Sequence, residues 1–237
     1  MKHFAILIGF AAIAFTSCES DQILDVNKGR AIDFRVAAQS RATEVTTENL
    51  TTFYVTALDQ KSNNYFTNVA FTKIEEYFCS SPSYFWPGDG SDLDFYAYAP
   101  STVSLGADVT INNSTKTLHG FSPAAYISDQ TDFMTARATG NKSDETDGVA
   151  LTFNHQLAQI EIKARNANEG YIYNIRGVRI AQPVSKADFD FESSQWSLDP
   201  DSKAVYQVQY NHDITLNTYG QCIMETEGDN AMLIPQQ

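Results

Sequence analysis

Short runs of alternating apolar and polar residues recur along the chain from residue 31 onward. In "AIDFRVA" (31–37), Ile32, Phe34 and Val36 fall on one face of a strand, and Asp33 and Arg35 fall on the other. A period of two is typical of a half-buried β-strand. The same pattern recurs in the segments 52–58, 68–74, 92–100, 148–153, 158–164, 177–181, 188–193 and 205–210.

Turn-forming residues separate these segments. Clusters of Gly, Asn, Asp, Ser and Pro lie at 61–64, 87–90, 111–114, 138–148, 166–170 and 198–202. Many short strands joined by polar turns indicate an antiparallel β-sandwich or barrel. Aromatic residues make up 12% of the chain and are mostly Phe and Tyr, which suit β-surfaces. We therefore predict an all-β fold.

The pattern breaks at "RNANEG" (165–170), which we interpret as a domain junction. An N-terminal β-sandwich is then expected over 42–166 and a second body over 167–237. The second range is short for an independent β-sandwich of about 100 residues. The last apolar segment, "AMLIP" (231–235), has no obvious partner strand after it. An unpartnered strand leaves an open sheet edge, so we expect the second body to be the start of a C-terminal sandwich that is truncated here.

Residues 1–17 resemble a secretory signal peptide. Lys2 and His3 precede an apolar run from Phe4 to Phe15, which is too short for a membrane span of about 20 residues. The run ends in "FTSC" (15–18), a pattern at which a lipoprotein signal peptidase cuts before the cysteine. We therefore predict that Cys18 is lipidated and that residues 18–41 form a lipidated tether and a first strand. The alternative is a plain cleaved signal with an incidental cysteine.

The formal net charge of −13 limits the partners of the chain. Nucleic-acid binding needs a basic face, so no nucleic-acid partner is expected. The acidic balance also opposes electrostatic attachment to anionic lipid. Acyl chains on Cys18 would carry the anchoring instead, since each buried methylene contributes about 0.8 kcal/mol.

No residue set in the sequence fits a catalytic or cofactor site. The chain has four histidines, none at ligand spacing from a cysteine, a glutamate or another histidine, and we expect no metal, no cofactor and no enzyme activity. His155 lies between two apolar runs and is interpreted as a hydrogen-bonded core residue. Asp89, Asp92 and Asp94 could attract calcium, but a solvated turn is the favoured interpretation because the order of residues does not fit an EF-hand loop.

Two further features leave alternatives open. The aromatic stretch "YFCSSPSYFW" (77–86), which ends in Trp86, could form a sugar-stacking shelf on the surface or pack into a buried edge. Cys79 and Cys222 could pair in an oxidising compartment, but the sequence does not give their separation.

A proteolytic site is predicted between Arg41 and Ala42. These residues lie in the polar stretch "AAQSRATEV" (37–45), directly after the first strand. Exposed polar loops are where proteases cut. The alternative is an ordinary loop arginine.

Several motifs in a fixed order carry a family resemblance. The cysteine motif is followed by "IDFRV" (32–36), "SRA" (40–42), "YFWP" (84–87), "LDFYAYAP" (93–100), "TDFMTARA" (131–138), "VALTFNHQLAQIEIKA" (149–164) and "AMLIPQ" (231–236). In this order and spacing, over residues 18–237, the chain resembles the fimbrillin family, which comprises type V pilus subunits and related surface lipoproteins of Bacteroidota.

The resemblance implies a fold, a location and an assembly mechanism. The fold would be two tandem transthyretin-like Greek-key β-sandwiches, and the chain would be an outer-membrane lipoprotein at the cell surface and in the fimbrium. A processing protease would cut after Arg41 and remove the strand that contains Ile32, Phe34 and Val36. The emptied groove would accept a strand from another pilus subunit, because a missing strand exposes unpaired backbone groups and an apolar groove. The partners are then other subunits, the protease and outer-membrane lipid bound through Cys18.

Related chains continue well beyond "LIPQ". A fragmentary gene, a short variant and a subunit that accepts a strand but donates none are three explanations that the sequence leaves open. The alternative function is that of a monomeric, lipid-anchored surface module that binds glycan or host protein.

Overall fold

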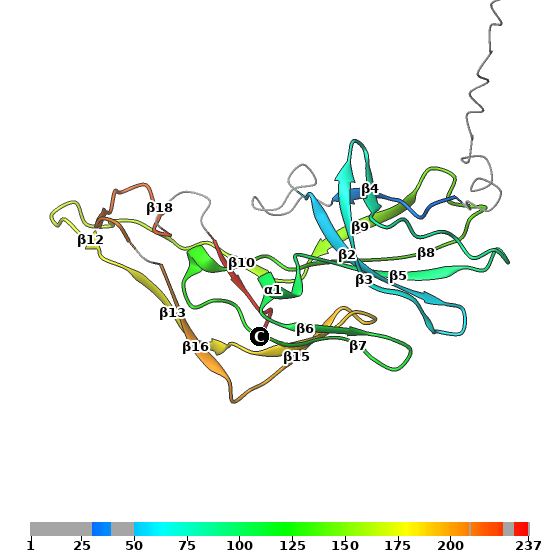
Figure 1. Ribbon diagram of the computed structural model, residues 1–237. Coiled ribbons are helices and arrows are strands. Elements are labelled where there is room, and N and C mark those ends of the chain that lie inside the picture. Colours follow the sequence, from blue (N-terminus) through cyan, green and yellow to red (C-terminus); the bar gives the residue numbers. More distant parts are fainter. Residues whose placement is uncertain (1–29, 39–49, 209, 225–229, 237) are drawn as a thin grey trace, which may run out of the picture.

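The computed structural model describes residues 30–38, 50–208, 210–224 and 230–236, and the fold is almost entirely β (Figure 1). Cys18, Arg41 and Ala42 lie outside the described residues. The described part contains two short helices, α1 (Thr102–Leu105) and η2 (Ile127–Asp129). In this part of the chain no helix is long and apolar enough to cross a membrane. The predicted all-β fold class is confirmed.

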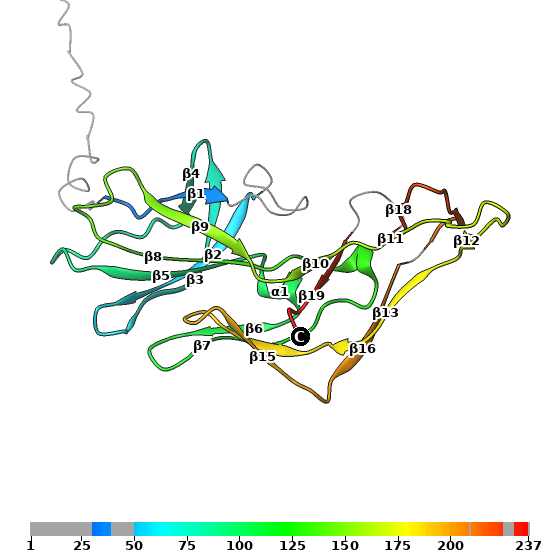
Figure 2. The same ribbon diagram turned by 180° about the vertical axis from the view of Figure 1, so that it is seen from behind.

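Seven strands close into a barrel that occupies one half of the molecule. They are β1 (Phe34–Ala38), β2 (Thr52–Asp59), β3 (Asn64–Ile74), β4 (Tyr77–Ser80), β5 (Leu93–Ala99), β8 (Met134–Gly140) and β9 (Val149–His155). Their order around the barrel is β1-β4-β3-β2-β5-β8-β9. Figure 2 shows β1 between β4 and β9. The ring closes because β1 pairs with β4 on one edge and with β9 on the other.

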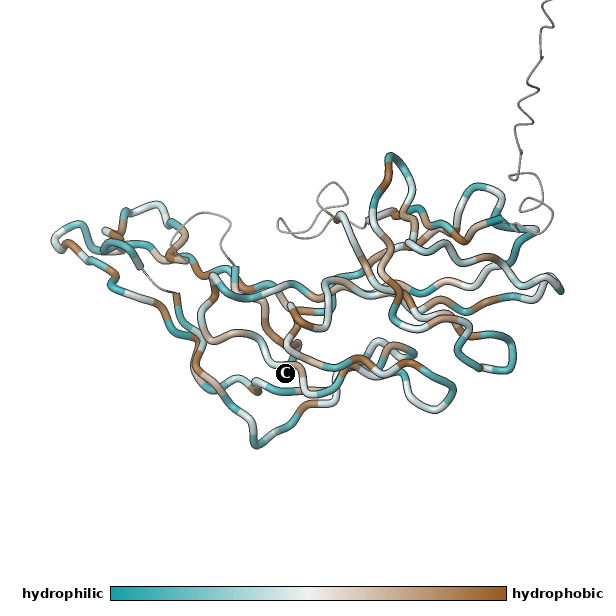
Figure 3. The backbone as a smooth tube through the Cα atoms, in the orientation of Figure 1, coloured by the Kyte–Doolittle hydropathy of each residue, from teal (hydrophilic) through white to brown (hydrophobic). Residues whose placement is uncertain are grey.

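The barrel interior is rich in aromatic residues because alternate positions on its strands point inward. The side chains of Phe34, Phe53, Phe71 and Phe95 are fully buried there, and Trp86 is 5% exposed. Apolar residues recur along these strands, whereas the loops at the barrel end farthest from β12 are mostly hydrophilic (Figure 3). Burial of these rings is the main stabilising term for this half of the molecule.

A four-stranded sheet packs against the outside of the barrel. It contains β6 (Asp108–Ile111), β7 (Lys116–Phe121), β14 (Ala187–Asp190) and β15 (Gln195–Leu198), in the order β15-β14-β7-β6. A second core lies between this sheet and the barrel, with Tyr96 and Tyr98 of β5 facing Leu118 and Phe189. Because β14 pairs with β7, strands from both sides of the expected junction at residue 166 share one sheet. The predicted division into bodies over 42–166 and 167–237 stays a prediction.

The remaining strands form a long arm. They are β10 (Ala158–Ile160), β11 (Lys163–Ala164), β12 (Asn174–Ile175), β13 (Val178–Val184), β16 (Lys203–Val208), β17 (Ile214–Thr215), β18 (Gln221–Cys222) and β19 (Ala231–Leu233). Each pairs antiparallel with a single partner: β10 with β19, β11 with β18, β12 with β17 and β13 with β16. A small core with Tyr206, Met224 and Leu233 at its centre packs residues of β10, β13, β16, β18 and β19 together.

Candidate functional site: the first strand and the groove that it fills

The first strand is held by backbone hydrogen bonds along both edges. It runs parallel to β9, with five residue pairs from Phe34 opposite Val149 to Ala38 opposite Phe153. Just before the strand, the Ile32 amide donates to the Tyr84 carbonyl at 2.8 Å. On the β4 side, Phe34 is the one residue of β1 that is paired, and its partner is Phe78. The strand therefore fills a gap between two strands that come later in the chain.

The inward side chains of this segment fill the centre of the barrel. Ile32 is 1% exposed and Phe34 is fully buried, as the alternation in the sequence predicts. The Phe34 ring meets the rings of Phe53, Phe71 and Phe95 at centroid distances of 5.8, 4.7 and 5.2 Å, all edge to face. Val36 is half-buried and packs against the same cluster. Without these side chains, the barrel would expose a groove lined by aromatic rings.

A polar contact on the outer face ties the strand to both of its neighbours. Arg35 lies 2.9 Å from the Asp147 carboxylate, in the loop before β9. The Tyr77 hydroxyl of β4 donates to the same carboxylate at 2.5 Å. This hydrogen bond is the largest cause of the raised pKa of Tyr77, followed by the negative charge of Asp147. The sequence did not identify Tyr77 and Asp147 as partners of Arg35. The alternation in "DFRV" (33–36) indicates only that Arg35 lies on the polar face of the strand.

A half-buried thiol lies near the same strand. Cys79 of β4 is half-buried, and burial is the main cause of its raised pKa, with a hydrogen bond to Asp33 as a second cause. A thiol with a raised pKa is a poor nucleophile because it is seldom ionised. Cys79 and Cys222 form no disulfide with each other in the structure. The chemistry of this region is therefore that of packing and hydrogen bonding.

The acidic cluster considered for calcium has other roles in the structure. Asp89 accepts from the amide and the hydroxyl of Ser91, Asp92 accepts from Asn141, and Asp94 accepts from Thr139. Within the described residues, no group of three or more histidine, cysteine or acidic side chains could hold a metal ion. These aspartates stabilise turns and strand ends, as the favoured interpretation predicts.

The other two sequence candidates lie in the protein interior. The His155 ring nitrogen Nδ1 is 2.5 Å from the buried Asp132 carboxylate, which agrees with a hydrogen-bonded core histidine. Trp86 lies in the barrel core, where its ring meets that of Phe95 at 5.7 Å. Phe78 is also buried. Phe78 and Trp86 therefore pack inward, whereas Phe85 is 37% exposed, and Trp86 is not available for stacking on a sugar.

Comparisons with known proteins agree with this fold. A family model described as fimbrillin-like matches residues 40–237. No curated protein matches the chain. Among solved structures, a fimbrial protein from Bacteroides vulgatus is similar at 20% identity, with a TM-score of 0.67 over 87% of this chain and 77% of that one. A proposed cell adhesion protein from Bacteroides uniformis is similar at 14% identity, with a TM-score of 0.56 over 86% of this chain and 73% of that one.

The structural similarities support the fold, and the family model covers most of the sequence. Its matched range begins after β1 and includes every other strand of the barrel, the four-stranded sheet and the arm. The chain belongs to the fimbrillin-like family.

Proposed function

We propose that this chain is a fimbrial subunit that is exported as a lipoprotein and assembled by exchange of its first strand. Family membership supports a fimbrial or adhesive subunit at the cell surface. The finer steps are lipidation of Cys18, cleavage after Arg41 and replacement of β1 by a strand of another subunit.

One observation carries the proposal: β1 is a core element that a single backbone cut would detach. The strand ends at Ala38 and the next strand of the barrel begins at Thr52. A cut between these strands leaves every other strand of the barrel connected to the rest of the chain. Arg41 is the only Lys or Arg between Ala38 and Thr52, so a trypsin-like protease has one site in this connection.

The groove that β1 would leave is suited to another extended strand. It offers the free backbone edge of β9 and a pocket for an aromatic side chain among Phe53, Phe71 and Phe95. An added strand gains main-chain hydrogen bonds for affinity, and pockets for alternate side chains give specificity. The vacant groove would otherwise expose apolar surface to water, which is unfavourable by about 25 cal/mol per Å².

Limited proteolysis with a peptide-uptake assay tests this mechanism. The full-length chain is treated briefly with trypsin, and the mass of the product identifies the cut. A fluorescent peptide of residues 30–38 is then added to cut and uncut protein. We expect cleavage after Arg41, and uptake of the peptide by the cut protein alone. A peptide with Phe34→Asp serves as the matched control and should not bind, since it places a carboxylate among the rings.

Two results would contradict the mechanism. One is a protein that resists cleavage between residues 38 and 50 while other sites are cut. The other is cut protein that takes up neither the peptide nor a strand of a second subunit. Lipidation is tested separately: labelled palmitate should enter the wild-type chain in a Gram-negative host and should not enter a Cys18→Ser variant.

A further inference from the structure

The arm ends in a tip that exposes large apolar side chains. We define the arm tip as residues 163–179 and 210–221. Within it, Tyr171, Ile172 and Tyr219 are 62%, 81% and 93% exposed. Backbone hydrogen bonds fix the two halves of the tip to each other, from the Asn166 amide to the Asn217 carbonyl at 2.6 Å and from the Leu216 amide to the Tyr173 carbonyl at 2.9 Å. Clusters of exposed apolar side chains on fixed loops mark interaction sites.

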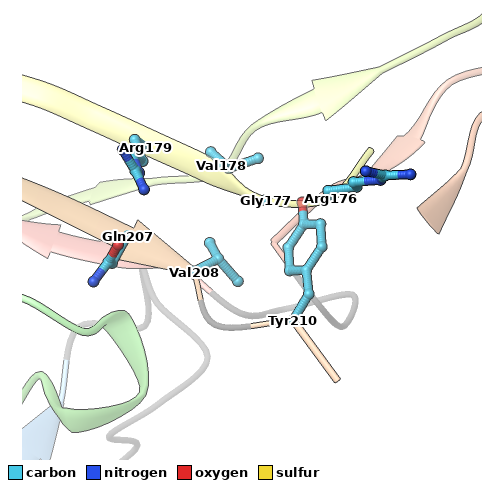
Figure 4. A pocket seen from close by; sticks show the side chains of 7 residues that line it. All are labelled: Arg176, Gly177, Val178, Arg179, Gln207, Val208 and Tyr210. Carbon is cyan, nitrogen blue, oxygen red and sulfur yellow. The ribbon is translucent and has the colours of Figure 1, made fainter. Parts of the chain in front are cut away.

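The arm tip is also the basic part of an acidic protein. It carries four Lys or Arg residues and two acids, although the whole chain has a net charge of −13. Arg176 has a side chain that is 85% exposed and pairs with Asp213 at 3.5 Å. Arg176 and Arg179 line a hollow of roughly 590 Å³ together with Val178, Val208 and Tyr210 (Figure 4). Arginine and tyrosine, with tryptophan, are enriched among the residues that contribute most of the binding energy at protein interfaces.

The opposite end of the molecule has the complementary charge. We define the barrel-end loops as residues 59–63, 87–92 and 141–148. They lie at one end of the barrel because Leu93 pairs with both Asp59 and Gly140. The loops carry six acids and two lysines. Figures 1 and 2 show these loops and the arm tip at opposite ends of the molecule, joined by the chain from β9 through β10 and β11 to β12.

The barrel-end loops are held in shape by hydrogen bonds, which also lower the pKa of two of their carboxyl groups. Asn141 of one loop donates to Asp92 of another at 2.8 Å. Hydrogen bonds from Asn63 lower the pKa of Asp59, and hydrogen bonds from Ser91 lower the pKa of Asp89. A fixed, projecting acidic surface therefore lies at one end, and a hollowed basic surface lies at the other.

We propose that the arm tip of one copy docks against the barrel-end loops of a second copy. The charges of the two surfaces are complementary, and a contact between two different surfaces of the same chain does not close on itself, so repetition gives a row of subunits. The contact rests on the proposed function, since it would place consecutive subunits end to end for strand exchange. The partner is a copy of this chain because the chain itself carries both complementary surfaces.

Charge reversal at each end provides the test. The full-length chain is made with Cys18→Ser, so that no acyl chain drives association, and its self-association is measured by sedimentation at low salt. Arg176→Glu with Arg179→Glu reverses the tip, and Asp89→Lys with Asp144→Lys reverses the loops. Lys186→Glu with Lys203→Glu is the matched control for the tip reversal, because it changes the net charge by the same amount at exposed positions outside both surfaces.

We expect each reversal to raise the dissociation constant at least about tenfold, and the control to change it less than about twofold. Raising the salt from 20 to 500 mM should weaken the wild-type contact, since these charges are exposed to solvent. The decisive arm mixes the two reversed variants. Each repels itself, but the basic tip of one then meets the acidic loops of the other, so the mixture should associate within about threefold of wild type.

The mixture also separates a failed contact from a failed fold, because misfolded variants would not rescue each other. The proposal is overturned if the wild-type chain stays monomeric at all concentrations, if either reversal leaves association unchanged, or if the mixture stays dissociated. All measurements use uncut chain with β1 in place. If the reversals do not affect association but the cut protein still takes up the peptide, only the proposed contact is refuted. If the chain associates as expected but the cut protein takes up no peptide, only strand exchange is refuted.

Discussion

Truncation of Phe34 is the sharpest test of how much the first strand contributes to the barrel. Phe34 is fully buried and meets three aromatic rings edge to face within 5.8 Å. Replacing a buried phenylalanine by alanine lowers the free energy of unfolding by about 3 to 5 kcal/mol, because transfer energy is lost and a cavity remains. We expect Phe34→Ala near the upper end of that range. Its neighbours come from β2, β3 and β5, which the closed barrel prevents from moving inward.

The assay follows urea unfolding by tryptophan fluorescence. The chain has two tryptophans, and Trp86 lies in the barrel core while Trp196 packs against the second core. A Trp196→Phe background therefore makes Trp86 the reporter of the barrel. The matched control is Phe85→Ala, which removes the same atoms from a side chain that is 37% exposed. We expect its effect to be less than half that of Phe34→Ala.

A loss of less than about 1 kcal/mol for Phe34→Ala would refute the reasoning, because a surface substitution has an effect of that size. It would mean that the barrel is stable without the contacts of β1. The groove would then have little need of a replacement strand, and strand exchange would lose its driving force.

Two further predictions concern backbone conformation and pH. Gly148→Ala should lower the melting temperature and the free energy of unfolding by about 1 to 2 kcal/mol, since Gly148 has φ of +77° and a Cβ there would lie 3.3 Å from the Asp33 carbonyl oxygen. Asp190→Asn should reduce the free energy of unfolding at neutral pH, because hydrogen bonds, first from the Ser193 amide, lower the pKa of Asp190 in the folded state. A carboxyl group whose pKa is lower in the folded state than in the unfolded state stabilises the folded protein at pH values above the unfolded-state pKa. The difference in the free energy of unfolding between wild type and Asp190→Asn should therefore shrink as the pH falls from 5 toward 3. Urea titrations of both proteins across that range check the sign.

Local alternation was sufficient to predict the strand content and the inward face of β1. Ile32 and Phe34 are buried as the sequence predicts, because a strand with one apolar face has only one favourable orientation against a core. Turn formers around Asp89 likewise predict the turn that precedes β5. These features depend on residues within a few positions of each other.

Pairings between distant strands could not be predicted in this way. β14 pairs with β7, with Phe189 opposite Leu118. The alternation of β14 resembles that of the other strands, so it does not identify β7 as the partner. The partners of Arg35 were missed for the same reason, since Tyr77 and Asp147 become its neighbours only when the barrel closes. Trp86 was ambiguous because an aromatic residue after a short strand packs equally well in a core or on a surface.

The two proposed contacts differ in their physics, and the difference gives each a separate role. Strand exchange replaces the buried contacts of Ile32 and Phe34 with those of another strand, so its net free energy is small unless the incoming side chains fit the same pockets, and its barrier is high because the barrel must open. Contact between the arm tip and the barrel-end loops forms between exposed, oppositely charged surfaces, so it forms quickly and is weakened by salt. A fast electrostatic contact raises the local concentration of the next subunit at the groove. Slow exchange of a core strand would then convert that reversible encounter into a stable contact between the two subunits.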